Sequence, residues 1–162
     1  MQKITIISTG GTFNKIYNPK TGELEIDKSS KALQELAKKW LCHIEVVNLI
    51  GKDSLEMTQE DRNLLIATIK KCENRNMIVV HGTDTMEITA KALAKAQLQK
   101  NIVLTGAMVP FSIDPIEATA NLASAYGYLQ NVTTYGVTIA MNGLIDHYLK
   151  VKKDRTKGQF VP

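Results

Sequence analysis

Short apolar runs alternate with longer amphipathic segments along the chain of 162 residues. The apolar runs are rich in Ile and Val and end at turn residues, a pattern typical of buried strands. The longer segments carry apolar residues three and four positions apart, which indicates helices. Strands are predicted at residues 3–8, 44–50, 77–81, 102–105 and 135–141. Helices are predicted at residues 30–40, from Thr58 onward, at 85–99 and at 115–130.

Two helix starts and one hairpin have local signals. Thr58 and Asp61 stand three apart, the spacing of a capping box. Asp114 precedes Pro115, and Glu117 follows at the third helical position, which indicates a capped start. The segment FNKIYNPKTGELEI, within residues 13–27, is polar and contains a proline and a turn. It predicts a hairpin or a flexible flap.

The alternation of strands with helices predicts the fold class. Strands that are continuously apolar are typical of a parallel sheet covered by helices on both faces. We therefore expect a single doubly wound α/β domain over residues 1–162, Rossmann-like or flavodoxin-like, with a mostly parallel sheet. The length suits one domain with a real core.

Composition narrows the class of protein. Hydrophobic residues make up 44% and charged residues 22%, an ordinary globular balance. No apolar stretch approaches the roughly 20 residues of a membrane span, so no membrane partner is expected. The first residues lack the pattern of a signal peptide, which predicts a cytoplasmic location. Cys42 and Cys72 are expected to be two buried thiols rather than a disulfide.

The net charge of +4 is concentrated near the end of the chain, around Asp154. Such a basic run is usually a solvated face or tail, but it could also touch nucleic acid or supply a catalytic lysine. Interleaved aromatic residues are absent from the run, so no nucleic-acid partner is predicted. Its basic members are Lys150, Lys152, Lys153, Arg155 and Lys157.

Polar residues follow each predicted strand, where a doubly wound sheet binds its ligands. Thr12 follows two glycines in STGGTF, which lacks both the phosphate-loop spacing and GxGxxG. Thr83 and Asp84 stand where a buried strand meets a helix; capping with Glu87 could alone account for Asp84. A threonine hydroxyl becomes a nucleophile only beside a base or a lysine relay. The sequence leaves a simple turn and a catalytic edge as alternatives.

Three segments in this order resemble the bacterial-type L-asparaginases: STGGTF, HGTDTMEITA and IVLTGAMVP. The resemblance covers the larger N-terminal domain of that family and lacks the smaller second domain. The ending NGLIDHYLKVKKDRTKGQF resembles a short form in which this domain stands alone. In full-length members the second domain of a neighbouring subunit contributes an acid near the substrate's amino group, so selectivity for asparagine over glutamine is less defined here.

The resemblance implies roles for five residues. Thr12 would be the nucleophile, and Tyr17 in the flap would help to activate it, unless this ring simply packs on the core. Thr83, Asp84 and a late lysine would move protons and position the substrate. Lys153 is the first choice for that lysine and Lys152 the second.

The resemblance also implies a substrate pocket. Ser54 would hold the substrate's α-carboxylate, and Asp84 would bind its α-ammonium group. Backbone N–H groups near Thr83 would serve as oxyanion donors. Met108 could line the pocket or merely pack. The full set of expected binding residues is Gly11, Asp53, Ser54, Gly82, Ala107 and Met108.

Other candidates are interpreted as structural. His81 is expected to be a hydrogen-bonded core histidine, and Trp40 a core residue. His43 and His147 have no partners at ligand spacing, so neither a metal site nor another cofactor is expected.

The predicted activity is hydrolysis of L-asparagine to L-aspartate and ammonia through an acyl-threonine, by a homo-oligomer (dimer or tetramer) with a small-molecule substrate. Three alternatives remain. One is a non-catalytic amino-acid-binding or regulatory module. Another is an ammonia-releasing amidase active on glutamine. The last is an ammonia-supplying subunit for transfer-RNA-dependent amidation.

Overall fold

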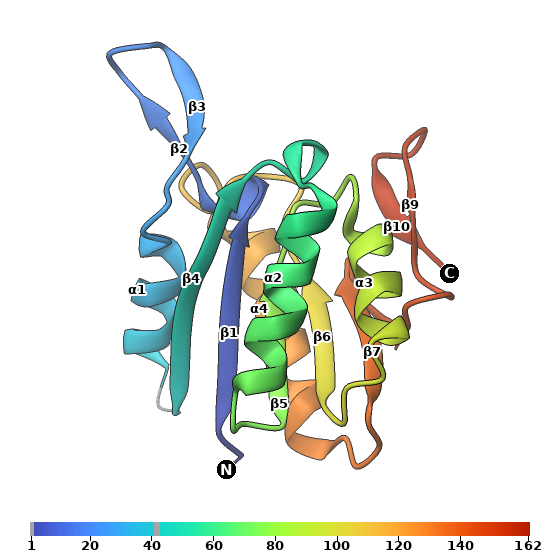
Figure 1. Ribbon diagram of the computed structural model, residues 1–162. Helices are drawn as coiled ribbons and strands as arrows, with labels where there is room; N and C mark the ends of the chain where they lie inside the picture. The colour runs from blue at the N-terminus through green and yellow to red at the C-terminus, as the bar shows by residue number, and fades with distance from the viewer. Residues whose placement is uncertain (1, 41–42) are drawn as a thin grey trace.

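A central sheet organises the computed structural model, which describes residues 2–40 and 43–162 (Figure 1). Within those residues six strands pair in the order β4-β1-β5-β6-β7-β8, the first five parallel and the last antiparallel to β7. In chain order the parallel strands run 2-1-3-4-5, the flavodoxin-like doubly wound arrangement. The predicted fold class is confirmed. Their bounds are β1 (Ile4–Gly10), β4 (Ile44–Lys52), β5 (Asn76–Val80), β6 (Asn101–Thr105), β7 (Gly136–Met141) and β8 (Leu144–His147).

Helices cover both faces of the sheet. α2 (Gln59–Lys71) and α3 (Met86–Lys95) pack on one face, and α1 (Lys31–Lys39) and α4 (Pro115–Asn131) on the other (Figure 1). Successive strand side chains point to opposite faces, so neighbouring isoleucines of β1 serve different cores. Ile7 packs in the core under α2 and α3, and Ile6 in the core under α1 and α4.

Both predicted helix starts form. Thr58 Oγ1 accepts from the Asp61 N–H at 3.2 Å, and an Asp61 carboxylate oxygen accepts from the Thr58 N–H at 2.9 Å, so the capping box of α2 is complete. Asp114 caps α4 by accepting from the Ile116 N–H at 3.0 Å. Glu117, at the third helical position, does not complete a capping box, because its carboxylate accepts from backbone N–H groups of the β6–α4 loop instead.

The third helix is shorter than predicted. α3 begins at Met86 rather than at Thr85 and ends at Lys95 rather than at Gln99. Gln97 adopts a left-handed conformation with φ of 47°. The chain must reverse there, because β6 begins only a few residues later.

The predicted hairpin is present as β2 (Lys15–Asn18) and β3 (Glu23–Ile26), paired antiparallel. It projects beyond the carboxyl ends of β1 and β4 (Figure 1). Its base is anchored by the buried Phe13, whose ring stacks on Phe111 with centroids 6.1 Å apart. The Asn14 amide group donates to Ser8 Oγ at 3.2 Å. We name residues 13–27 the flap.

The end of the chain is folded, not a solvated tail. β9 (Lys152–Asp154) and β10 (Gln159–Val161) form a hairpin beside α3 (Figure 1). Val151 and Phe160 anchor it, since both are buried in the core under α3. Two isolated apolar residues give no periodic signal, so the sequence did not reveal this hairpin; it did not reveal β8 either.

The cysteines and Trp40 were expected to be buried. Cys72, at the end of α2, has a free thiol, but the expectation that it is buried is wrong, because the residue is half-buried; Cys42 lies outside the described residues. Trp40 is half-buried, with its ring edge-on to that of Tyr126 and the ring centroids 5.5 Å apart.

In the described part of the chain, no helix has the length and apolar character to cross a bilayer. The same residues contain no cluster of three His, Cys, Asp or Glu side chains placed to hold a metal ion.

Candidate active site

Three loops meet without intervening side chains at the carboxyl edge of the sheet. A Cβ atom at Gly11 would lie 2.5 Å from the Gly82 nitrogen, and one at Gly82 would lie 2.6 Å from the Ser54 Cβ. Both distances are too short for a real carbon, so only glycine allows this packing. The junction lies between β1 and β5, the switch point where such sheets bind ligands. Thr12 and Thr83 each directly follow one of the two glycines.

Thr12 begins a single 3-10 turn, η1 (Thr12–Asn14), at the end of β1. Gly11 precedes it with φ of 73°, a left-handed conformation that glycine adopts at low cost. The Thr12 side chain is half-buried, and it makes no hydrogen bond to any other described residue. Its hydroxyl is therefore available to a ligand.

Thr83, Asp84 and Lys153 form one hydrogen-bonded group. Lys153 Nζ lies 2.8 Å from Thr83 Oγ1 and 2.9 Å from Asp84 Oδ1. The backbone N–H of Lys153 donates to Glu87 Oε1 at 2.9 Å, and this hydrogen bond fixes the position of the lysine on β9. Lys152 is exposed, because neighbouring residues of β9 point to opposite sides. The structure thus brings the first-choice lysine, and not the second, to Thr83 and Asp84.

Asp84 is an ionised partner in this group rather than a helix cap. The hydrogen bond from Lys153 lowers the pKa of Asp84 below its ordinary value, and the charge of Arg155 lowers it further. The capping interpretation of Asp84 is wrong, since Thr85 is the N-cap of α3 and Glu87 bonds to β9 instead.

Arg155 is a site residue that the sequence reasoning grouped with the surface run. Its Nη1 lies 2.7 Å from Asp84 Oδ1, and its Nη2 donates to the Asp84 carbonyl oxygen at 3.2 Å. No local pattern separated it from the other basic residues, because it lies in the turn directly after β9.

The loop after β4 contains an ion-paired carboxylate, that of Asp53, and a hydroxyl without a hydrogen-bond partner among the described residues, that of Ser54. Asp53 forms an ion pair with Lys15 at the base of the flap, at 2.9 Å, and caps the short turn η2 (Ser54–Glu56). Partial burial raises the pKa of Asp53, but hydrogen bonds from Lys15 and the Leu55 N–H outweigh it, so the net pKa is lowered. Ser54 is buried, and its hydroxyl has no hydrogen-bond partner among the described residues. The hydrogen-bonding capacity of that hydroxyl is therefore unused within the described residues.

The loop after β6 is held from below by α4. Glu117 accepts from the backbone N–H groups of Met108 and Val109, each at 3.0 Å. Asn121 donates to the Gly106 carbonyl at 3.0 Å. Ala107 is buried between these anchors, and Met108 is half-buried and packs on the core. Sequence reasoning missed the anchoring role of Glu117, which its position at a helix start concealed.

A buried polar chain lies beneath the glycine junction. Thr89 Oγ1 lies 2.8 Å from His81 Nε2 and accepts from Arg62 Nε at 3.0 Å. His81 Nδ1 lies 2.7 Å from the Gly82 carbonyl oxygen. His81 is fully buried, which lowers its pKa to about 4. The expected core histidine is confirmed.

Arg62 was not anticipated, because a charged residue on an amphipathic helix carries no sequence signal of burial. Its guanidinium is buried and donates to the Met57 carbonyl at 3.0 Å and to Thr85 Oγ1 at 3.2 Å. Thr85 in turn donates to the Ser54 carbonyl at 2.8 Å. Arg62 therefore supports two of the three loops that meet at the edge.

His81 predicts how stability depends on pH. Its pKa is about 4 in the folded protein and 6.5 ordinarily, so the unfolded chain binds one more proton between these values. The free energy of unfolding should therefore fall as the pH drops, by about 2 kcal/mol between pH 6.5 and pH 5. Urea unfolding at these pH values measures it. In His81→Gln the difference should nearly vanish; an unchanged pH dependence in that variant would contradict the assignment.

Tyr17 remains apart from the other candidates. Its side chain is 61% exposed on β2 and makes no hydrogen bond or ring contact to the described residues. The alternative that its ring packs on the core is wrong. The β2–β3 hairpin that carries this residue projects from the body of the protein (Figure 1).

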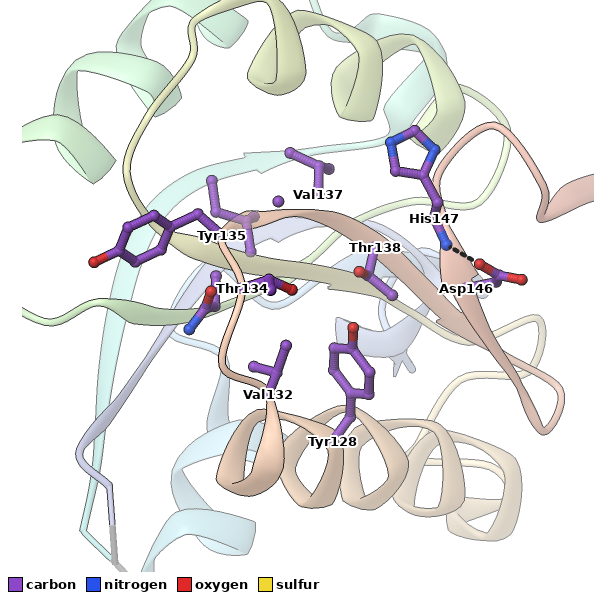
Figure 2. A pocket seen from close by; sticks show the side chains of 11 residues that line it. Tyr128, Val132, Thr134, Tyr135, Val137, Thr138, Asp146 and His147 are labelled. Carbon is purple, nitrogen blue, oxygen red and sulfur yellow. Dashed lines mark hydrogen bonds between the residues drawn. The ribbon is translucent and has the colours of Figure 1, made fainter.

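A separate cavity of about 190 Å³ opens at the other end of the sheet (Figure 2). Tyr128 of α4 and Val132, the residue directly after this helix, face Val137 and Thr138 of β7 across it. It is lined by the first residues of β6 and β7, so it lies at the amino ends of these strands. None of the predicted site residues lines it, and the candidate chemistry stays at the carboxyl edge.

Comparisons with known proteins point to one family. The family model described as "Asparaginase, N-terminal" matches residues 3–159. The chain is 30% identical to a probable periplasmic L-asparaginase of Haemophilus influenzae, over 88% of this chain and 43% of that protein. It is 28% identical to a glutaminase-asparaginase of Acinetobacter glutaminasificans, over 96% and 49%.

A solved structure shares the fold. The thermostable L-asparaginase from Thermococcus kodakarensis superposes with a TM-score of 0.83 at 25% identity, covering 98% of this chain and 50% of that one. The chain thus spans about half the length of the relatives it matches. A family match over nearly all of its residues shows that the chain belongs to the asparaginase N-terminal family.

Proposed function

We propose that this protein hydrolyses the side-chain amide of L-asparagine to give L-aspartate and ammonia. The observation that carries the proposal is the contact of Lys153 with both Thr83 and Asp84, beside the glycine junction that also presents Thr12. A hydroxyl, a carboxylate and a largely buried ammonium group in one hydrogen-bonded group form the type of relay that activates a hydroxyl nucleophile.

In the proposed reaction, Thr12 Oγ1 attacks the amide carbon, and the hydroxyl proton of Thr12 is relayed to the amide nitrogen. Backbone N–H groups near Thr83 stabilise the oxyanion that forms. The C–N bond then breaks, and ammonia leaves with a proton passed on by the Thr83–Lys153 pair. Water attacks the resulting acyl-threonine ester, which releases aspartate and returns the proton to Thr12.

Recognition of the substrate falls to the surrounding loops. The unpartnered Ser54 hydroxyl binds the α-carboxylate, and Asp84 binds the α-ammonium group. Gly11, Gly82, Ala107 and Met108 form the walls. Asp53 acts through its ion pair with Lys15, which ties the base of the flap to the substrate loop.

Tyr17 acts only when the flap closes, because its side chain has no partner in the open position. Removing its hydroxyl in Tyr17→Phe should lower kcat for asparagine by about 10- to 100-fold, the share of a group that assists proton transfer. Binding of aspartate, measured by calorimetry, should change less than threefold. A Tyr17→Phe variant with full kcat would remove Tyr17 from the mechanism.

The central experiment is ammonia release by the purified protein, with asparagine and glutamine assayed side by side. Equal amounts of ammonia and aspartate from asparagine support the proposal. Aspartate binding without ammonia release would favour a non-catalytic binding module. Faster release from glutamine would favour a glutamine-active amidase. A cytoplasmic location, a homo-oligomer and a single domain over residues 1–162 stay predictions.

A further inference from the structure

Two cationic side chains contact the same carboxylate oxygen of Asp84. Its Oδ1 lies 2.9 Å from Lys153 Nζ and 2.7 Å from Arg155 Nη1. Its other carboxylate oxygen makes no hydrogen bond to the described residues. Arg155 also donates to the Asp84 carbonyl oxygen, so its planar guanidinium bonds to this residue through two nitrogens.

The two cations differ in how firmly they are held. The Lys153 side chain is 12% exposed, bonds to Thr83 as well, and lies on a backbone fixed by Glu87. The Arg155 side chain is 62% exposed, and its hydrogen bonds to the described residues all go to Asp84. Arg155 can therefore swing into solvent at little cost, whereas Lys153 cannot leave without breaking the catalytic group.

We propose that Arg155 is a specificity-determining residue that occupies Asp84 where the α-ammonium group of an amino acid would bind. This inference rests on the proposed function, in which Asp84 receives that ammonium group. A ligand with an ammonium group must share the Asp84 carboxylate with the guanidinium or displace it, and a ligand without one need not. Arg155 thereby weakens binding of α-amino substrates relative to their deaminated analogues, and takes no part in breaking the amide bond.

Electrostatics gives the physical reason. With both cations present, the charge of Asp84 is already more than balanced, and a third cation there would be repelled by two others. Removal of Arg155 leaves one carboxylate and one lysine, so an arriving ammonium group meets one competing cation at Asp84 instead of two. The Arg155–Asp84 pair is partly exposed, which limits the size of the effect.

The same hairpin offers a matched control. The Lys157 side chain is 63% exposed, has the same charge as Arg155, and contacts Asp154 at 3.8 Å rather than Asp84. Lys157→Ala removes one positive charge from the turn between β9 and β10 without touching the site. Any general effect of net charge on anionic ligands will appear in both variants.

The test compares L-aspartate with succinate, which differ only in the ammonium group. Their dissociation constants are measured by calorimetry for the wild-type protein, Arg155→Ala, Arg155→Gln and Lys157→Ala. Both Arg155 variants should bind aspartate about three- to tenfold more tightly than wild type, with succinate changed less than twofold. Lys157→Ala should move neither constant. In turnover, KM for asparagine should fall in the Arg155 variants while kcat stays within twofold.

Three outcomes would overturn the proposal. Weaker binding of both ligands in the Arg155 variants would mean that the guanidinium binds a ligand carboxylate. An equal shift for both ligands would remove any role for the ammonium group. If none of the proteins bound aspartate, Asp84 would not be the binding site of this ligand's ammonium group. Failure of the proposed function gives a different result, in which wild type releases no ammonia although the aspartate–succinate difference appears.

Discussion

Replacement of Lys153 by methionine is expected to lower kcat for ammonia release by about 10²- to 10⁴-fold, the range for loss of a positioned proton-transfer group. Methionine keeps the length of the side chain but cannot donate to Thr83 Oγ1 or to Asp84 Oδ1, which now lie 2.8 and 2.9 Å from Nζ. The hydroxyl of Thr83 then loses its charged partner, and the relay is interrupted.

A second effect of Lys153→Met follows from the pKa of Asp84. The hydrogen bond from Lys153 is the main cause of the lowered pKa of this carboxyl. Without it the pKa rises toward its ordinary value, so Asp84 takes up a proton at a higher pH. The acidic limb of the residual pH–rate profile should therefore move to higher pH. A merely structural lysine would change the rate without moving this limb.

Lys152→Met is the control for this experiment. Lys152 precedes Lys153 on β9, has the same charge, and is exposed. Its replacement should leave kcat within twofold of wild type. Similar losses in both variants would show that the hairpin, and not the contact with Thr83, is what activity requires. Urea unfolding of each variant checks that the hairpin stays folded.

The alternation of apolar and amphipathic segments was enough to predict the parallel strands and the four helices. Each β1 residue, for example, is buried, as the continuous apolar run indicated. Parallel topology then placed Thr12 and Thr83 at one edge, because both follow adjacent strands. These features depend on local patterns and on one general rule of sheet geometry, so the sequence reveals them.

Other parts of the site depend on contacts between distant segments. Lys153 reaches Thr83 across 70 positions of the chain, and the choice between Lys153 and Lys152 depends on which side of β9 faces α3. Arg62 and Glu117 looked like ordinary helix residues, yet one is buried and the other anchors a loop. Neither the burial of a charged side chain nor a tertiary hydrogen bond produces a periodic pattern in the sequence, so these roles are visible only in the structure.

Loss of the Thr12 hydroxyl should have the largest effect of all. In Thr12→Ala no oxygen remains to attack the amide, and ammonia release from asparagine is expected to fall by about 10⁴-fold or more. The backbone should tolerate the change, since the Thr12 side chain is half-buried and makes no hydrogen bond to the described residues. Aspartate should still bind, because Ser54 and Asp84 are untouched.

The conservative variant separates chemistry from packing. Thr12→Ser keeps a hydroxyl and should retain a measurable fraction of the rate, whereas Thr12→Ala should not. Acid quenching during turnover, followed by peptide mass spectrometry, should find an aspartyl group esterified to the peptide that contains Thr12. If Thr83 carried that group instead, the two threonines would exchange roles. The glycine junction would then present Thr83 as the nucleophile, with Lys153 already within hydrogen-bond distance to activate it.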